Sequence, residues 1–204
     1  MPNEPIIHVI DDDEAVRDSL SFLLESAGMT VRSYDSARSF LAALATLEPG
    51  CIVTDVRMPE MSGLELVREL NVRACALPVI VITGHGDVPL AVEAMRAGVV
   101  DFIEKPFTDE TILNSLRSAI HRSQDQLEQA AERTAIARRL ASLSTRERQV
   151  LNGLVAGQAN KVVALDLGIS PRTVEVYRAN LMVKMQAASL SDLVRMTLLV
   201  EQPR

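Results

Sequence analysis

The stretch HVIDDDEAVR (residues 8–17) places three consecutive carboxylates directly after a short apolar run. The run IIHVI (6–10), which ends at these acids, is typical of a buried strand. The residues that follow the acids have helical periodicity, so the acids lie where a strand meets a helix. Negative charge at such a junction indicates either a helix cap or a site for a cation or a phosphoryl group.

Short apolar runs alternate with helical patterns through the rest of the first half. Strands are predicted at 6–10, 30–34, 51–56, 78–83 and 99–105, and helices at about 14–27, 36–46, 62–72, 87–97 and from 108 onward. This alternation predicts an α/β domain, a five-stranded doubly wound parallel sheet covered on both faces. In such a sheet, ligands bind at the carboxyl ends of the strands, where the strand order reverses.

Charge divides the chain into two parts. Residues 1–123 carry 10 Lys and Arg against 19 Asp and Glu, whereas residues 124–204 carry 11 against 8. With 48% hydrophobic residues, a chain of 204 residues is long enough for two cores. The split suggests a cation or a phosphodonor as ligand of the first half and nucleic acid as ligand of the second.

The cysteines and the N-terminal stretch indicate a cytoplasmic protein. Cys51 and Cys75 lie in apolar surroundings without metal-ligand spacing, which favours free thiols in a reducing compartment. The stretch MPNEPIIHVI (1–10) lacks the features of a signal peptide, and no apolar run approaches the roughly 18 residues of a membrane span. We therefore expect no contact with a membrane.

Reactive residue types stand at the expected carboxyl ends of four strands. The acids 11–13 follow the first strand, Asp55 ends the third, Thr83 the fourth and Lys105 the fifth. Taken singly, each has an ordinary explanation as a helix cap, a turn former, a loop hydroxyl or a solvated cation. Taken together, they predict a pocket of crowded carboxylates that a cation such as Mg²⁺ would neutralise. Beside Mg²⁺ and Lys105, Asp55 can act as a nucleophile toward a phosphoryl group.

Four motifs in this half resemble the signature of receiver domains of two-component response regulators. They are HVIDDDEAVR (8–17), IVTDVRMPEMSGLEL (52–66), VITGHGD (81–87) and DFIEKPF (101–107). The resemblance implies a phosphorylation site with these parts: the phosphoacceptor Asp55, the Mg²⁺ ligands Asp11, Asp12, Asp55 and the backbone carbonyl of Arg57, the switch residues Thr83 and Phe102, and the cation Lys105. It also implies a cis Lys105–Pro106 bond and a phosphohistidine of a sensor kinase as phosphoryl donor.

Beyond residue 140 the pattern changes to short helices. Ser144 and Glu147 form a capping box, Gly168 ends a helical segment, and Ser170 caps the next helix, in which Pro171 comes first. Four short helices fit either a small helical bundle or a helix-turn-helix unit, whose second helix enters the major groove.

The sequence motif in this half favours the helix-turn-helix unit over a generic helical bundle. LSTRERQVLNGLVAGQANKVVALDLGISPRTVEVYRANLMVKM (143–185) resembles the DNA-binding domains of the LuxR/NarL/FixJ class, with 141–204 as the expected domain. The docking of that family implies that Glu175, Val176 and Ala179 lie over base edges. The full set of expected DNA contacts is Lys161, Arg172, Thr173, Glu175, Val176, Arg178, Ala179 and Lys184. The small positive charge predicts weak binding by a monomer and useful affinity only for a dimer.

Between the expected receiver (1–123) and this domain, residues 124–140 are predicted to form a helical linker. The linker lacks Gly and Pro and continues the last receiver helix. A heptad pattern is clear at Leu113 and Ile120 but weak beyond Leu127. The sequence therefore fits both a dimeric coiled coil and a single surface helix in this segment.

The resemblance also predicts how the signal reaches DNA. Phosphorylation would draw Thr83 and Phe102 inward and create a homodimer face made of Val92, Met95, Arg96 and Val100. The expected partners are a FixL-type sensor histidine kinase, double-stranded promoter DNA, RNA polymerase and a second copy of the chain. The target genes would be those of nitrogen fixation or microaerobic growth. The protein is not expected to be an enzyme beyond its own phosphoryl transfer and dephosphorylation.

Two other functions fit parts of the sequence. A Mg²⁺-dependent phosphohydrolase could use the same acidic pocket, and DDDEA (11–15) is similar to an Asp-x-Asp nucleophile motif. That function leaves residues 143–200 unexplained and lacks a substrate-binding cap. Alternatively, the helical domain binds protein rather than DNA, and a salt-dependent gel shift with promoter DNA distinguishes these cases.

Overall fold

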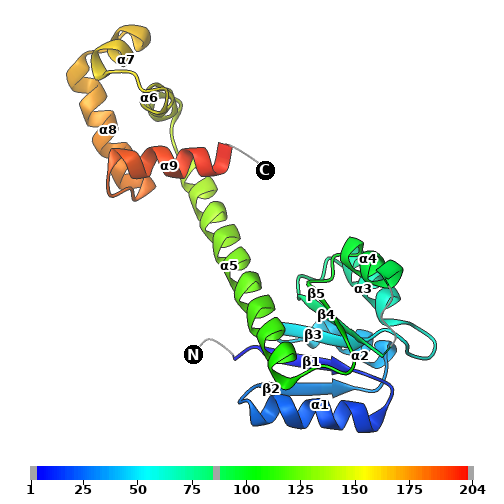
Figure 1. The fold of residues 1–204 in the computed structure, drawn as a ribbon. Helices are drawn as coiled ribbons and strands as arrows, with labels where there is room; N and C mark the ends of the chain where they lie inside the picture. The colour runs from blue at the N-terminus through cyan, green and yellow to red at the C-terminus, as the bar shows by residue number, and fades with distance from the viewer. Residues whose placement is uncertain (1–3, 85–87, 202–204) are drawn as a thin grey trace. The chain divides into compact units, whose positions relative to one another are not determined.

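The N-terminal half is built on a five-stranded parallel sheet (Figure 1). In the computed structural model, which describes residues 4–84 and 88–201, the strands are β1 (Ile6–Ile10), β2 (Thr30–Tyr34), β3 (Gly50–Asp55), β4 (Val79–Thr83) and β5 (Asp101–Glu104). Their order in the sheet is β2-β1-β3-β4-β5. The order reverses between β1 and β3, so the prediction of a doubly wound parallel sheet is confirmed.

Helices follow the strands as the alternation predicts. They are α1 (Glu14–Ser26), α2 (Ala37–Ala43) with the 3₁₀ turn η1 (Leu44–Thr46), α3 (Gly63–Val72), α4 (Val88–Arg96) and α5 (Asp109–Ala141). Asp87, with which one helix was predicted to begin, lies outside the described residues. Asp13 is the N-cap of α1, since its carboxylate accepts hydrogen bonds from the backbone N–H groups of Ala15 and Val16.

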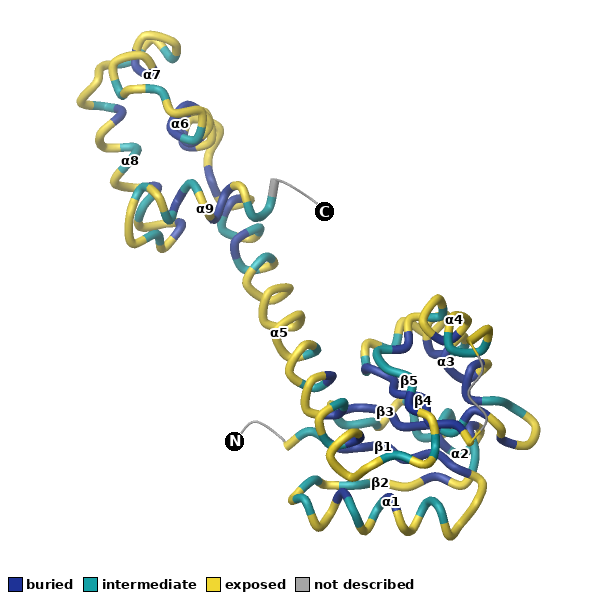
Figure 2. Tube along the Cα trace, in the orientation of Figure 1, coloured by how far each residue is buried: buried dark blue, intermediate teal, exposed yellow. Residues whose placement is uncertain are grey.

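Each face of the sheet carries its own apolar core. Ile7 and Val9 of β1 point to the face covered by α1 and α5, while Ile10 points to the face covered by α2, α3 and α4. Figure 2 shows the buried strands at the centre of this unit, between exposed outer helix surfaces. Because side chains alternate along a strand, a short run of consecutive apolar residues suits a sheet that is buried on both sides.

The second compact unit comprises residues 126–204, and up to residue 201, where the description ends, its regular elements are all helices. Its short helices are α6 (Thr145–Val155), α7 (Asn160–Leu167), α8 (Pro171–Met185) and α9 (Leu190–Glu201). The predicted start and stop signals are confirmed. Ser144 and Glu147 form the capping box of α6, Gly168 ends α7 with φ of +66°, and Ser170 caps α8.

The division between the two units falls inside α5, between residues 125 and 126. The heptad residues Leu113 and Ile120 pack against the core that α1 and α5 form with the sheet, so this part of the pattern is occupied within its own unit. Ile136 and Leu140, near the other end of the helix, are buried in the core of the second unit. Figure 2 shows the middle of α5 as mainly exposed, and Leu127 there is 56% exposed. The clear heptad residues therefore lie against the core of their own unit, and the coiled coil stays a prediction.

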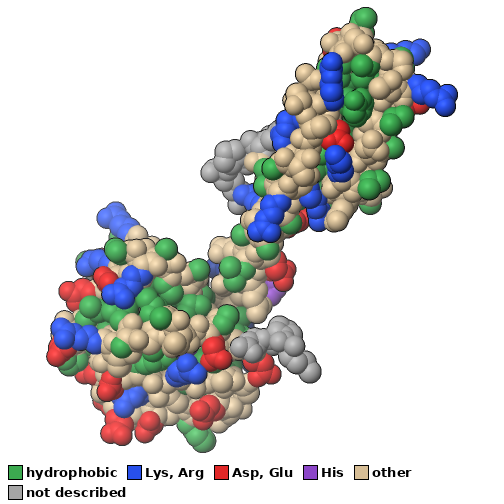
Figure 3. All heavy atoms as spheres, turned by 180° about the vertical axis from the view of Figure 1, so that it is seen from behind, with side chains coloured by type: hydrophobic (Ala, Val, Ile, Leu, Met, Phe, Trp, Pro, Cys, Tyr) green, Lys and Arg blue, Asp and Glu red, His purple; other side chains and the backbone are tan. Residues whose placement is uncertain are grey.

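The distribution of charged side chains and the state of the two cysteines agree with the expectations from the sequence. In Figure 3, red acidic side chains are frequent over the sheet unit and blue basic side chains over the helical unit. Cys51 is a free, buried thiol whose pKa is raised to about 12 by burial, and Cys75 is free and partly buried. Within residues 4–84 and 88–201, no helix is both long and apolar enough to cross a membrane.

Candidate functional site

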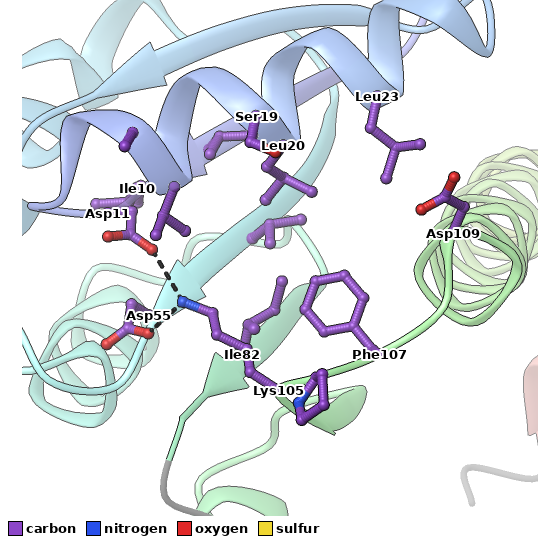
Figure 4. A pocket seen from close by; sticks show the side chains of 15 residues that line it. Ile10, Asp11, Ser19, Leu20, Leu23, Asp55, Ile82, Lys105, Phe107 and Asp109 are labelled. Carbon is purple, nitrogen blue, oxygen red and sulfur yellow. Dashed lines mark hydrogen bonds and ion pairs between the residues drawn. The ribbon is translucent and has the colours of Figure 1, made fainter.

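Three charged side chains from three strand ends meet at the carboxyl edge of the sheet. The Lys105 ammonium lies 3.0 Å from Asp55 Oδ1 and 3.3 Å from Asp11 Oδ2 (Figure 4). Asp11 follows β1, Asp55 ends β3, and Lys105 follows β5, so residues up to 94 positions apart converge. The predicted convergence of the strand tips is thus seen for these three residues. The Lys105–Pro106 bond is cis, as expected.

The position of Asp55 is fixed by its own loop. Its Oδ2 accepts a hydrogen bond from the backbone N–H of Arg57 at 2.6 Å. Gly63, the first residue of α3, passes so close to the Asp55 carbonyl oxygen that a Cβ there would collide with it. A backbone collision cannot be relieved by a side-chain rotation, so only Gly fits at this position.

Burial and charge act against each other in this pocket. Asp11 is buried, and burial raises the pKa of its carboxyl group, although Lys105 opposes the shift. Burial alone would lower the pKa of the Lys105 ammonium, but the carboxylates of Asp55 and Asp11 outweigh burial and raise it. Lys105 therefore remains a cation that bridges two acids, and it can neutralise further negative charge that arrives between them.

The oxygen atoms of this pocket suit a small hard cation. Asp11 and Asp55 offer carboxylates, and the exposed Arg57 next to the pocket offers a backbone carbonyl. Asp12 is exposed next to Asp11. Among the described residues no group of three or more His, Cys, Asp or Glu is close enough to form a complete protein cage for a metal. Mg²⁺ needs no such cage, because it usually takes one or two carboxylates and keeps several water ligands.

The two predicted switch residues lie on the neighbouring strands β4 and β5. Thr83 is buried at the end of β4, and its carbonyl oxygen accepts the backbone N–H of Lys105 at 2.8 Å. Phe102 of β5 is partly buried against the core under α2, α3 and α4.

A cleft of about 490 Å³ extends from Asp11, Asp55 and Lys105 between α1 and the start of α5. Its walls are mainly apolar.

The predicted dimer face is exposed and partly apolar. Val92 and Met95 of α4 are 43% and 54% exposed, and Arg96 beside them is exposed as well. Val100, just before β5, is partly buried. Large exposed apolar side chains on one helix are consistent with an interaction surface, and the dimer itself stays a prediction.

Most predicted DNA contacts lie on the outer surface of α8. Arg172, Glu175, Val176 and Ala179 are exposed, whereas Thr173 and Arg178 are partly buried. Thr173 is also engaged locally, because its hydroxyl shares a hydrogen bond with Ser170 Oγ at 2.8 Å. A hollow of about 530 Å³ brings Lys161 of α7 together with Glu175 and Arg178 of α8. These contacts with DNA remain predictions that suit the exposed surface.

Lys184 has a role that its sequence does not suggest. Its ammonium lies 2.8 Å from the buried carboxylate of Glu147, 37 residues away. This partner and the Ser144 cap hold the pKa of Glu147 down at about 2. The capping box marked Glu147 as part of a helix start, but the ion pair of Glu147 with Lys184 depends on the tertiary packing of α6 against α8. Lys184 thus ties α6 to α8 besides being exposed to solvent.

Comparisons with known proteins match both halves. Residues 7–117 match the response regulator receiver domain, and residues 141–197 match bacterial regulatory proteins of the luxR family. The chain belongs to the response regulator family. This response regulator is FixJ-like, since it is 61% identical to the transcriptional regulatory protein FixJ of Azorhizobium caulinodans, over 98% of the chain and 94% of the relative. FixJ of Bradyrhizobium diazoefficiens is 54% identical over 94% of each protein.

A solved structure agrees with the match along the whole chain. Full-length FixJ from B. japonicum shares 52% sequence identity with this response regulator, covers 98% of each chain and has a TM-score of 0.63. The response regulator therefore combines a phospho-accepting receiver with a LuxR-type DNA-binding domain, and it is a transcriptional regulator. The receiver implies a sensor kinase as partner, and the second domain implies DNA.

Proposed function

We propose that Asp55 accepts a phosphoryl group from the phosphohistidine of a FixL-like sensor kinase. In this step the P–N bond of the phosphohistidine breaks and a P–O bond to the Asp55 carboxylate forms, while the imidazole leaves. The observation that carries the proposal is the Lys105 ammonium held 3.0 Å from Asp55 and 3.3 Å from Asp11. An ammonium in this position stabilises negative charge on the transferring oxygens, because it is already oriented toward the acceptor.

Mg²⁺ is the proposed cofactor of this transfer. Asp11, Asp12, Asp55 and the carbonyl of Arg57 would hold it at the edge of the sheet, since hard cations prefer oxygen ligands. When bound, Mg²⁺ would neutralise charge on the phosphoryl oxygens. Without a cation, the incoming phosphoryl group would meet two carboxylates that only one ammonium, that of Lys105, compensates.

The proposed output is a dimer on DNA. Thr83 and Phe102 respond to the phosphoryl group, and the exposed α4 surface with Val92 and Met95 pairs with a second copy. Two copies of α8 then reach two half-sites of a promoter, where the regulator recruits RNA polymerase. The similarity to FixJ proteins supports nitrogen-fixation or microaerobic genes as targets. We further propose that the protein works in the cytoplasm and catalyses only its own phosphorylation and dephosphorylation.

Intact mass and sizing test this function. The full chain and its Asp55→Asn variant are incubated with Mg²⁺ and acetyl phosphate, then with a duplex that carries candidate half-sites. We expect only the wild type to gain one phosphoryl group, to shift from monomer to dimer, and to bind the duplex more tightly and in a salt-dependent manner. A phosphoryl group on Asp55→Asn, or a wild type that gains none, would refute the proposal. Steady turnover of small phosphoesters would instead favour a phosphohydrolase.

A further inference from the structure

Arg17 of α1 reaches back to the residue that begins the acidic pocket. Its guanidinium Nη1 donates a hydrogen bond to the backbone carbonyl oxygen of Asp11 at 2.8 Å. Asp11 follows the last residue of β1, and the strand pairing on both sides of β1 ends at Ile10. The sheet therefore does not satisfy this carbonyl, and the half-buried Arg17 does so with a charge-assisted hydrogen bond.

Every polar group of Asp11 is held from a different direction. Its backbone N–H donates to the carbonyl of Tyr34 on β2 at 3.3 Å. Its Oδ1 accepts the backbone N–H of Asp13 at 3.0 Å, and its Oδ2 lies 3.3 Å from the Lys105 ammonium. Arg17 supplies the fourth anchor, so the orientation of the peptide that follows Asp11 depends on it.

Arg17 also closes a ring of contacts with the start of α1. Its backbone N–H donates to the carbonyl of Asp13 at 2.9 Å, and Asp13 in turn caps α1 and holds the carboxylate of Asp11. The guanidinium thus links α1 to the end of β1 through a charge-assisted hydrogen bond, which fixes the distance between the helix and Asp11. The ring lies directly beside the carboxylate that faces Lys105.

We infer that Arg17 is a positioning residue for the phosphorylation site, which acts by holding Asp11 in the orientation that a divalent cation requires. This inference rests on the proposed function of Asp55. Residues that orient metal ligands without touching the metal typically contribute 10–100-fold to metal affinity. Arg17 fits this class, since it contacts the backbone carbonyl of Asp11 and not the carboxylate that would bind the metal.

Mg²⁺ titration of the full chain tests the inference. NMR shifts of the backbone amides of Asp11–Asp13 measure Mg²⁺ affinity without any phosphoryl transfer. We expect Arg17→Ala to weaken Mg²⁺ binding by about 10-fold or more. We expect Arg17→Lys to recover part of that loss, since Lys keeps a charged donor but lacks the rigid planar fork. Phosphorylation of Arg17→Ala by acetyl phosphate should then approach the wild-type rate at saturating Mg²⁺.

Arg32→Ala is the matched control. Arg32, on β2, makes an exposed ion pair with Glu48 at 3.0 Å, so its removal changes the charge of the same unit by the same amount without any contact to Asp11. Thermal unfolding without Mg²⁺ shows whether each variant is folded. If Arg17→Ala is unfolded, Arg17→Lys carries the test and must still bind Mg²⁺ several-fold more weakly than wild type.

Two results would overturn the inference while leaving the proposed function intact. In the first, Arg17→Ala binds Mg²⁺ as well as Arg32→Ala does, which would make Arg17 only a stabiliser of α1. In the second, Arg17→Lys regains full affinity, which would show that charge alone matters. If instead the wild type binds no Mg²⁺ and accepts no phosphoryl group, the proposed function fails, and the role of Arg17 fails with it.

Discussion

The end of α5 offers a sharp test of where the DNA-binding unit begins. Ile136 is 1% exposed and packs in the core of the second unit, although the sequence places it in a linker. Replacement by Ala removes three buried carbon atoms and leaves a cavity, and such changes cost about 2–5 kcal/mol. For a unit of this size each kcal/mol shifts the unfolding midpoint by about 4–8 °C. We therefore expect Ile136→Ala to lower the midpoint of the second unit by about 10 °C or more.

Leu127→Ala provides a control on the same helix. Leu127 is 56% exposed, so its truncation should change stability by less than about 0.5 kcal/mol. Calorimetry of the full chain, with each transition assigned by amide signals from its own unit, measures both variants. The transition of the first unit should stay where it is in both. Equal midpoints for Ile136→Ala and Leu127→Ala would show that the last turns of α5 do not belong to the DNA-binding core.

Three further perturbations test other contacts. Glu147 has its pKa lowered to about 2 from an ordinary 4.5, chiefly by Lys184, so its stabilisation is present above pH 4.5 and is lost as pH falls toward 2. Lys184 is half-exposed, so we expect the second unit to lose roughly 1–2 kcal/mol of stability in acid, and Lys184→Met should reduce this pH dependence while the Ser144 hydrogen bonds retain part of it. Gly63→Ala should reduce phosphorylation and lower the unfolding midpoint of the receiver, because the new Cβ collides with the backbone carbonyl of Asp55. Gly84→Ala is the control: its Cβ would point into open space, so the midpoint should stay unchanged. The Asn71 side-chain amide donates a 2.7 Å hydrogen bond to the carbonyl oxygen of Ala97, just beyond α4. Asn71→Ala should therefore speed hydrogen exchange of the backbone amides at that end of α4, and unchanged exchange would refute the role of Asn71 as an anchor.

The receiver pocket was predictable because its parts sit at strand ends. Once alternation gives a parallel sheet, each residue that ends a strand must lie at one edge, and this rule brought Asp11, Asp55 and Lys105 together. The predicted helix caps have the same basis, since Ser144 and Ser170 depend only on residues within one turn. Local rules and one topological rule were therefore enough for these features.

Contacts between elements followed no such rule. The pair of Glu147 with Lys184 joins α6 to α8 over 37 residues, whereas the sequence marks Glu147 only as part of a helix cap and Lys184 only as a candidate DNA contact. Arg17 likewise looks like an ordinary helix cation, because nothing in its neighbours shows that the carbonyl of Asp11 lacks a partner in the sheet. Such contacts depend on how helices are rotated and placed, and periodicity specifies a helical face but not the atom that this face meets.

The helix α5 shows that one apolar pattern fits more than one packing partner. The heptad spacing of Leu113 and Ile120 was real, but the same spacing marks any helix that lays one face on a core, and here that core is the receiver's own. Ile136 and Leu140 are four residues apart and meet a second core, although the polar residues around them have the composition of a linker. Periodicity measures how apolar residues are spaced on one face, whereas the partner of that face is decided by tertiary packing. For a helix that serves two cores, the two buried ends and the exposed middle are therefore the informative feature, and the mutation of Ile136 examines the end that the sequence assigns to a linker.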